Sequence, residues 1–193
     1  MAETTLVLGG ARSGKSELAE ELVAGYGSKV IYVATAGVWD EEMYRRVALH
    51  RRRRLPSWLT VEETHDPGVV FDDRVFGMDA VMIDCLTLWV SNLLLDQNLP
   101  CPGAGDGAKE AYILDRAKAL VAACVGCPVP VVLVSSEVGA GIVPEHKLAR
   151  LFRDAAGGVN RIVASQAHRV IWSVAGIPVE IKKCAKSVQY PKL

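Results

Sequence analysis

The residues best suited to chemistry stand near the start of this chain, where positions 9–16 read GGARSGKS. They carry the spacing G-x-x-x-x-G-K-S, in which Lys15 and Ser16 close a glycine-rich segment. In such a loop the backbone N–H groups and the next helix N-terminus bind phosphate oxygens, the lysine reaches the β- and γ-phosphates, and the serine hydroxyl ligates Mg²⁺. An apolar run at 6–8 precedes the segment and a helical pattern follows it. The pattern therefore predicts a nucleoside triphosphate site, not an ordinary glycine-rich turn.

A second candidate for chemistry is His50, near the end of a predicted helix. Asp40 can cap this helix, its first turn is acidic and its last turn is the arginine run 51–54, which suits the helix macrodipole at both ends. At about 100° per residue, His50 shares a stripe with Met43 and Val47 and so points toward the body of the protein. Two interpretations stay open: a half-buried histidine with a structural role, or a nucleophile.

The arginine run 51–54 has three possible meanings. Such runs are usually solvated faces or nucleic-acid patches. Here 22 Lys and Arg balance 22 Asp and Glu, and no aromatic residue interrupts the run, which disfavours nucleic acid. A phosphate clamp fits better, because arginine binds phosphate in a bidentate manner and neighbouring cations favour the neutral imidazole that a nucleophile needs. Histidine, arginines and a P-loop together indicate attack on a phosphorus atom.

The elements that must position these residues follow from the apolar runs, which alternate with helical patterns. The runs lie at 5–8, 29–35, 80–83, 129–134, 170–174 and 178–181. This alternation predicts an α/β fold of the P-loop NTPase type, doubly wound, with a mainly parallel sheet and helices on both faces. Ligands bind beyond the carboxyl ends of such strands, which selects the loops at 9–16, 35–40, 84–87 and 135–144. We expect one nucleotide-binding domain over 1–183 and a C-terminal tail over 184–193, with 98–107 as a surface loop or lid.

Asp84 is the leading candidate for an acidic residue that holds Mg²⁺ or its water, because it follows the buried run 80–83. Its strand is expected beside the P-loop strand or one removed from it. Alternatively, its carboxylate caps a helix that begins at Leu86. Glu137, after the run at 129–134, is a second candidate for the metal.

The composition of the chain indicates which kinds of partner the protein binds and where in the cell it is located. Its 193 residues, half of them hydrophobic, suit a single domain, and the balanced charge favours small-molecule partners over nucleic acid. The most apolar stretch, 80–95, contains Asp84, and the N-terminus lacks a cationic leader, so we expect no membrane insertion and a cytoplasmic location. Five cysteines fit reduced thiols, and the pair Cys124 and Cys127 lacks the further ligands of a structural zinc site.

Several separated blocks together resemble the bifunctional adenosylcobinamide kinase/adenosylcobinamide-phosphate guanylyltransferase family of cobalamin biosynthesis, over roughly residues 5 to 183. The first block is common to many enzymes, whereas the histidine block combined with EVGxGIVPE is specific. The blocks are GGARSGKS at 9–16, YVATA at 32–36, DEEMYRRVALHRRRR at 40–54 with Trp58 and Glu62 after it, DCLTLWVSNLL at 84–94, and SSEVGAGIVPEHKLARLFRDAAGGVN at 135–160.

The resemblance implies two successive reactions, a homotrimer, Mg²⁺, and GTP and ATP as substrates. A nucleoside triphosphate phosphorylates the aminopropanol hydroxyl of adenosylcobinamide, and GMP then passes from GTP through a guanylyl-histidine at His50 to give adenosylcobinamide-GDP. Ser16 and Asp84 are the implied metal ligands, with Lys15 as a further catalytic residue. Some relatives carry glutamate in place of Asp84, so a contact to guanine stays open for it. The implied nucleotide-binding residues are Gly9, Gly10, Ala11, Arg12, Ser13, Gly14, Lys15, Ser16, Ala34, Thr35, Ala36, Arg51, Arg52, Arg53, Arg54, Glu62 and Asp84.

The alternative function is a P-loop small-molecule kinase without nucleotidyl transfer, which would leave His50 without a role. A regulatory GTPase would carry N-K-x-D to read guanine, and this motif does not occur in the chain. Structural or core roles are expected for the remaining histidines and for the tryptophans, which are His65, His146, His168, Trp39, Trp58, Trp89 and Trp172.

Overall fold

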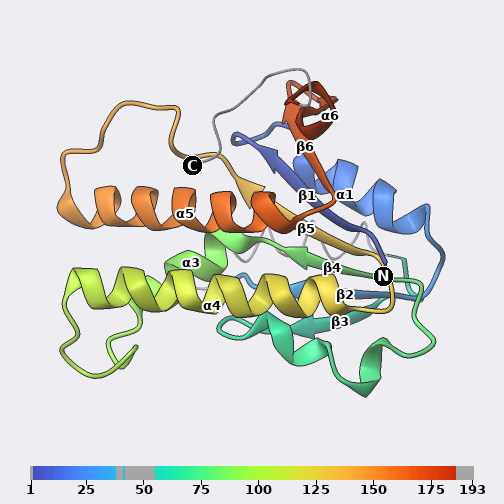
Figure 1. Ribbon diagram of the computed structural model, residues 1–193, viewed down its shortest axis with the longest axis horizontal. Helices are drawn as coiled ribbons and strands as arrows, with labels where there is room; N and C mark the ends of the chain where they lie inside the picture. The colour runs from blue at the N-terminus through green and yellow to red at the C-terminus, as the bar shows by residue number, and fades with distance from the viewer. Residues whose placement is uncertain (1, 38–40, 42–54, 186–193) are drawn as a thin grey trace.

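A computed structural model describes residues 2–37, 41 and 55–185 of the chain (Figure 1). Its strands and helices alternate along most of the sequence. In chain order they are β1 (Thr4–Gly9), α1 (Lys15–Ala24), β2 (Val30–Ala34), β3 (Leu59–Glu62), the 3₁₀ turns η1 (Pro67–Val70) and η2 (Asp73–Val75), β4 (Ala80–Asp84), α3 (Leu86–Leu95), α4 (Asp106–Gly126), β5 (Val131–Ser136), α5 (Lys147–Gln166), β6 (Arg169–Val174), β7 (Ile177–Glu180) and α6 (Ile181–Ala185).

The strands form one sheet in the order β3-β2-β4-β5-β1-β6-β7. Every neighbouring pair is parallel except β6 and β7, which form an antiparallel hairpin at one edge. Helices α4 and α5 run side by side across one face of this sheet (Figure 1), and α1 packs against the other. The predicted doubly wound, mainly parallel α/β fold is confirmed.

The core has two layers because consecutive residues of a strand point to opposite faces of the sheet. One layer joins the strands to α1 and contains Val7, Ala19, Val23, Tyr32, Met82, Val132 and Val134. The other joins them to α3, α4 and α5 and contains Leu6, Ile31, Val33, Ile83, Trp89, Ile113, Leu133 and Val159. Since both faces are covered, the central strands are continuous apolar runs in the sequence.

The strand order decides how far the candidate site residues lie from the P-loop. Strand β5 lies between β1 and β4, so the strand that ends at Asp84 is one removed from the P-loop strand. With neighbouring strands about 4.8 Å apart, β4 is about 10 Å from β1 and β3 is about 19 Å from it. Because β1 to β6 all run in the same direction, their carboxyl ends meet at one edge of the sheet. The short edge strand β3 has no counterpart among the predicted runs.

Candidate nucleotide site

The predicted P-loop connects the carboxyl end of β1 to the start of α1. Two of its residues have a positive φ, Arg12 at 55° and Gly14 at 82°, and they turn the chain between strand and helix. Helix α1 begins at Lys15, directly after Gly14, so its unpaired N-terminal N–H groups open onto the loop. Positions 9–16 thus form the strand–loop–helix unit that phosphate binding by this motif requires.

The side chains of the P-loop hold polar groups that a phosphate or a metal would satisfy. The Nζ of Lys15 donates to the carbonyl oxygen of Gly10 at 3.3 Å, so the lysine side chain lies back across the loop. Ser13 and Ser16 are buried, and the Ser13 hydroxyl has no hydrogen-bond partner among the described residues. Burying a polar group without a partner is unfavourable, which marks this loop as a place where a ligand is expected.

A second group of predicted residues lies in one row across the carboxyl ends of three neighbouring strands. Ala34 on β2 pairs in register with Glu62 on β3 and with Asp84 on β4. Thr35 joins two of these strand ends: its N–H donates to the Asp84 carbonyl oxygen at 3.1 Å, and its hydroxyl donates to the Cys85 carbonyl oxygen at 2.7 Å. The structure therefore brings Ala34, Thr35, Glu62 and Asp84 together, with the partly exposed Ala36 next in the loop.

The carboxylate of Asp84 is held by a tyrosine that the sequence pattern did not single out for a role. The Tyr32 hydroxyl donates to Oδ2 of Asp84 at 2.7 Å, and the Tyr32 ring stacks on Trp58 with a centroid distance of 6.3 Å. The helix that follows begins at Leu86 and takes Cys85 as its N-cap residue, with no side-chain cap. The alternative of Asp84 as a helix cap is therefore wrong, because its carboxylate lies toward the α1 side of the sheet with Tyr32.

The thiol next to Asp84 is not a suitable nucleophile. Burial raises the pKa of Cys85 to about 12, and the negative charge of Asp84 adds to this shift. The peptide bond between these two residues is cis. Burial likewise raises the pKa values of Cys124 and Cys127, so the C-x-x-C pair stays protonated, and no disulfide links the cysteines of the described residues.

Glu137 lies closer to the P-loop strand than Asp84 does, because it follows β5, the neighbour of β1. Its backbone N–H donates to the Gly9 carbonyl oxygen at 3.1 Å. Its side chain folds back and accepts a hydrogen bond from the N–H of Gly139. Glu137 thus stays a second acidic candidate, with one carboxylate oxygen already bound to its own loop.

A sequence model of the cobinamide kinase / cobinamide phosphate guanyltransferase family matches residues 5–181. The chain belongs to this family. It is 45% identical to the bifunctional adenosylcobalamin biosynthesis protein CobU of Escherichia coli K12, over 92% of this chain and 98% of that one. It is 42% identical to CobP of Pseudomonas aeruginosa, over 92% and 96%, and 43% identical to CobU of Salmonella typhimurium, over 92% and 98%. A crystal structure of the RadB recombinase is similar with a TM-score of 0.44 and 16% identity, over 88% of this chain and 73% of that one.

The candidate site of this cobinamide kinase / guanyltransferase chain divides into two parts. The P-loop and the row that contains Ala34, Glu62 and Asp84 lie within the described residues. The predicted nucleophile His50 and the arginines 51–54 lie outside them, as does the predicted cap Asp40. The assignment of the histidine and of the phosphate clamp therefore stays a prediction.

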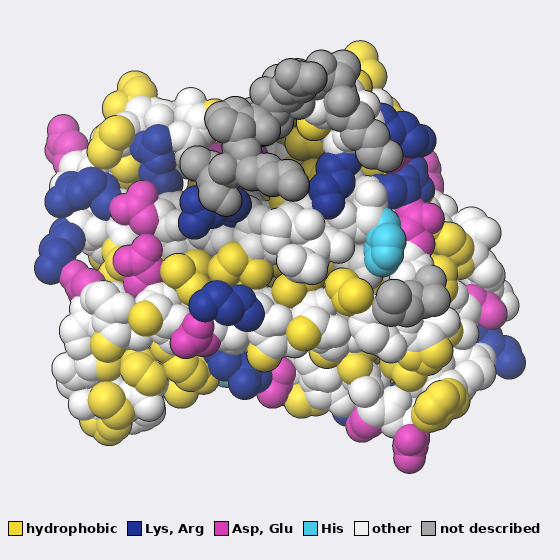
Figure 2. Space-filling view, viewed as in Figure 1, with side chains coloured by type: hydrophobic (Ala, Val, Ile, Leu, Met, Phe, Trp, Pro, Cys, Tyr) yellow, Lys and Arg dark blue, Asp and Glu magenta, His cyan; other side chains and the backbone are white. Residues whose placement is uncertain are grey.

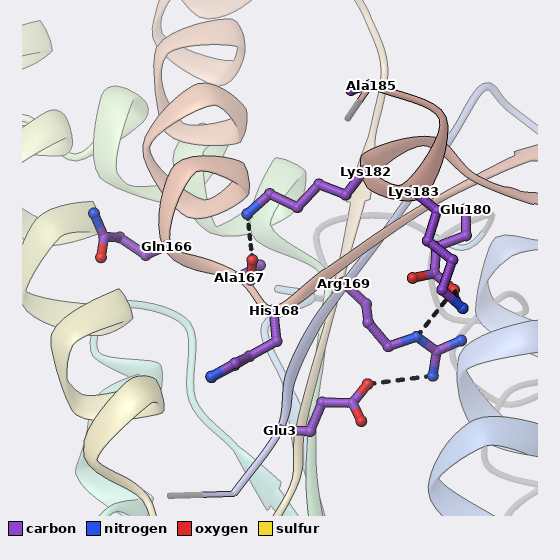
Figure 3. A pocket seen from close by; sticks show the side chains of 9 residues that line it. All are labelled: Glu3, Gln166, Ala167, His168, Arg169, Glu180, Lys182, Lys183 and Ala185. Carbon is purple, nitrogen blue, oxygen red and sulfur yellow. Dashed lines mark hydrogen bonds and ion pairs between the residues drawn. The ribbon is translucent and has the colours of Figure 1, made fainter. Parts of the chain in front are cut away.

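A pocket of about 800 Å³ lies at the opposite edge of the sheet, beside the amino ends of β1 and β6 (Figure 3). Four of its charged side chains form ion pairs: Arg169 bonds Glu3 at 3.2 Å and Glu180 at 3.3 Å, and Lys183 bonds Glu180 at 2.9 Å. Lys182 donates to the carbonyl oxygen of Ala167 at the end of α5. This pocket lies away from the carboxyl ends of the strands, where such sheets bind ligands.

Basic and acidic side chains are intermixed over the face of the molecule that carries α4 and α5 (Figure 2).

None of the helices in the described part of the chain has the length and apolar character needed to cross a membrane. The same residues contain no group of three or more His, Cys, Asp or Glu that could hold a metal.

Proposed function

We propose that this protein phosphorylates the aminopropanol hydroxyl of adenosylcobinamide with a nucleoside triphosphate and then transfers GMP from GTP to the new phosphate. The product is adenosylcobinamide-GDP. The observation that carries this proposal is the family match over residues 5–181, on a chain whose P-loop has strand, loop and helix in place. The relatives, which are named as bifunctional adenosylcobalamin biosynthesis proteins, align over 92% of this chain. GTP and ATP are the proposed phosphoryl donors.

In the first reaction the bond between the γ-phosphorus and the bridging oxygen breaks, and the substrate hydroxyl forms a new bond to that phosphorus and releases its proton. The protein has little covalent chemistry to perform in such a transfer, so positioning and charge stabilisation dominate. The backbone N–H groups of the P-loop and the Lys15 ammonium would stabilise the charge that collects on the β- and γ-oxygens.

In the second reaction the imidazole of His50 attacks the α-phosphorus of GTP, and the bond to the bridging oxygen of pyrophosphate breaks. An oxygen of adenosylcobinamide phosphate then attacks the same phosphorus and releases the histidine. This route divides one transfer into two easier displacements. Cys85, next to Asp84, is a poor alternative nucleophile, because its raised pKa keeps the thiol protonated. This supports a histidine as the nucleophile.

The positions of the described residues support a nucleotide that lies along the carboxyl edge of the sheet. The P-loop follows β1, and the row of Ala34, Glu62 and Asp84 begins on β4, about 10 Å away. A triphosphate held by the P-loop would project its α-phosphate and guanosine toward that row. In this proposal His50 attacks that α-phosphate, and the arginines 51–54 bind the phosphate oxygens.

Asp84 is proposed as the acidic residue for Mg²⁺, together with the Ser16 hydroxyl, because a carboxylate and a hydroxyl are ligands that this ion accepts. Bound Mg²⁺ would neutralise charge on the phosphate oxygens. The variant Asp84→Asn is expected to raise the Mg²⁺ concentration for half-maximal kinase activity by about tenfold. Asp115→Asn, at an exposed position of α4, should leave it unchanged. If Asp84→Asn instead alters only the preference for GTP over ATP, Asp84 reads guanine and does not serve the metal.

We propose a cytoplasmic location, because the cysteines of the described residues are free thiols, which are typical of a reducing compartment.

We also propose that the protein is a homotrimer. The β6–β7 hairpin presents an exposed apolar face, on which Trp172 opposes Val179 and Val174 opposes Ile177. An apolar face of this kind is typical of a surface that another subunit covers. Light scattering on the purified protein should give three times the 20.8 kDa mass of one chain. The mass of a single chain would contradict the trimer.

The experiment that tests the function uses GTP labelled with ³²P at either the α- or the γ-position. The protein is mixed with Mg²⁺ and labelled GTP, denatured, and examined for bound label. A phosphoramidate adduct that carries the α-label, survives alkali and is lost in acid is the expected result, and cobinamide phosphate should discharge it. Transfer of the γ-label to adenosylcobinamide without any α-labelled protein would indicate the plain small-molecule kinase instead.

A further inference from the structure

The end of β6 and the turn into β7 hold the outer side of the P-loop. The Ser173 hydroxyl donates to the Ser13 carbonyl oxygen at 2.5 Å, and the backbone N–H of Gly176 donates to the same oxygen at 3.0 Å. Ser173 is only 2% exposed, and it stands in register with Gly9 at the start of the loop. Two donors from the hairpin therefore converge on one carbonyl group of the P-loop.

The P-loop and the hairpin are in direct backbone contact. A Cβ atom on Gly9 would lie 2.6 Å from the carbonyl oxygen of Ser173, which is closer than real Cβ contacts. A Cβ atom on Gly14 would lie 3.4 Å from the Cα of Gly176. Gly14 also has a φ of 82°, a backbone conformation that residues with a side chain rarely adopt. The glycines at both ends of the motif thus allow the loop to lie directly against β6 and the turn. The hairpin acts as a fixed support for the loop.

This support sets the direction of a backbone donor. The peptide bond between Ser13 and Gly14 is trans, and in a planar trans peptide the C=O and N–H groups point in opposite directions. Because the Ser13 carbonyl points to the hairpin, the N–H of Gly14 points away from it. Among the described residues, no acceptor takes this N–H.

We infer that Ser173 is a positioning residue for phosphate binding: by fixing the Ser13 carbonyl together with Gly176, its hydroxyl turns the Gly14 N–H toward the bound phosphate. Donors that already point at the ligand need no reorganisation when it binds or reacts. Without the Ser173 hydroxyl, only the Gly176 N–H holds the Ser13 carbonyl, and the peptide plane gains freedom to rotate. The inference rests on the proposed function for the identity of the ligand, and both reactions should depend on Ser173 because both use the P-loop.

The test measures binding of inorganic pyrophosphate with Mg²⁺ by calorimetry, for the full chain and its variants. Ser173→Ala is expected to weaken pyrophosphate binding by about 3- to 10-fold, the usual size of one lost hydrogen bond. The KM for GTP and for ATP should rise by a similar factor, with a smaller change in kcat. Ser173→Thr keeps the hydroxyl and should restore binding to within about twofold of the wild type.

A matched control separates positioning from loss of stability. Thr4→Val removes another buried hydroxyl, which donates to the Cys124 carbonyl oxygen at 3.4 Å. Thr4 is the first residue of β1, at the end of the strand opposite to the P-loop. The variant should lower the melting temperature, because a buried hydroxyl loses its place, and leave pyrophosphate affinity unchanged. Wild-type affinity in Ser173→Ala, or an equal loss in Thr4→Val, would overturn the inference. Normal pyrophosphate binding in a protein that does not turn over adenosylcobinamide would overturn the proposed function alone.

Discussion

Replacing His50 with alanine is expected to abolish the covalent GMP adduct and to lower guanylyl transfer by at least about a thousandfold. Phosphorylation of adenosylcobinamide should continue, because the P-loop and the strand-end residues that we propose for the first reaction do not include this imidazole. The two activities are measured separately, with α-labelled GTP for the adduct and γ-labelled nucleotide for the kinase. Loss of one activity and survival of the other would assign the nucleophile.

His65 offers a matched control for this variant. Its Nε2 lies 3.2 Å from Oδ2 of Asp96 and its Nδ1 lies 2.8 Å from the Thr64 hydroxyl, which are the contacts of a structural histidine. His65→Ala should therefore retain the adduct, even where it lowers stability. An α-labelled adduct that persists in His50→Ala would assign the covalent step to another residue.

The central strands and the P-loop could be predicted from the sequence because their signals are local. Strands β1, β2, β4 and β5 are covered on both faces by helices, and such strands must be continuous apolar runs. The P-loop is likewise a continuous segment, in which the glycines, Lys15 and Ser16 have fixed spacing. Local patterns of this kind need no knowledge of the strand order.

The edge strand β3 could not be predicted in the same way. It has a single neighbour, β2, and its residues Leu59, Thr60 and Glu62 are exposed, so the segment LTVE carries no apolar run. Its position nevertheless decides where Glu62 lies, in register with Ala34. The strand order also decided between the two predicted places for Asp84, because β5 is inserted between β1 and β4 only in the folded chain.

The supporting residues of the site were missed because their contacts are long-range. Ser173 is 160 residues from Ser13 in the sequence, and Tyr32 is 52 residues from Asp84. A lone serine in an apolar strand and a tyrosine in a buried run look like ordinary core positions. A polar side chain among the apolar residues of a strand is the one signal available, since such a group needs a partner where it is buried.

Replacing Lys15 with alanine is expected to lower both the kinase and the guanylyl transfer reactions, each by about 10²- to 10³-fold, the usual effect of losing one donor at a developing charge. In this structure the Lys15 ammonium rests on the Gly10 carbonyl oxygen, within the loop that would hold the phosphates. It would stabilise the β- and γ-oxygens in phosphoryl transfer and the departing pyrophosphate in the attack on the α-phosphorus. Steady-state rates and adduct formation measure the two effects.

The comparison of Lys15→Ala with His50→Ala distinguishes a shared phosphate site from two separate ones. Lys118→Ala, which removes an exposed ammonium paired with Asp115 on α4, controls for the loss of one positive charge and should leave both reactions unchanged. If Lys15→Ala abolished phosphorylation and left the α-labelled adduct at its wild-type level, GTP for the second reaction would bind elsewhere than the P-loop. If one P-loop serves both transfers, Lys15→Ala should lose the kinase and the guanylyl transfer activity, whereas His50→Ala should lose only guanylyl transfer.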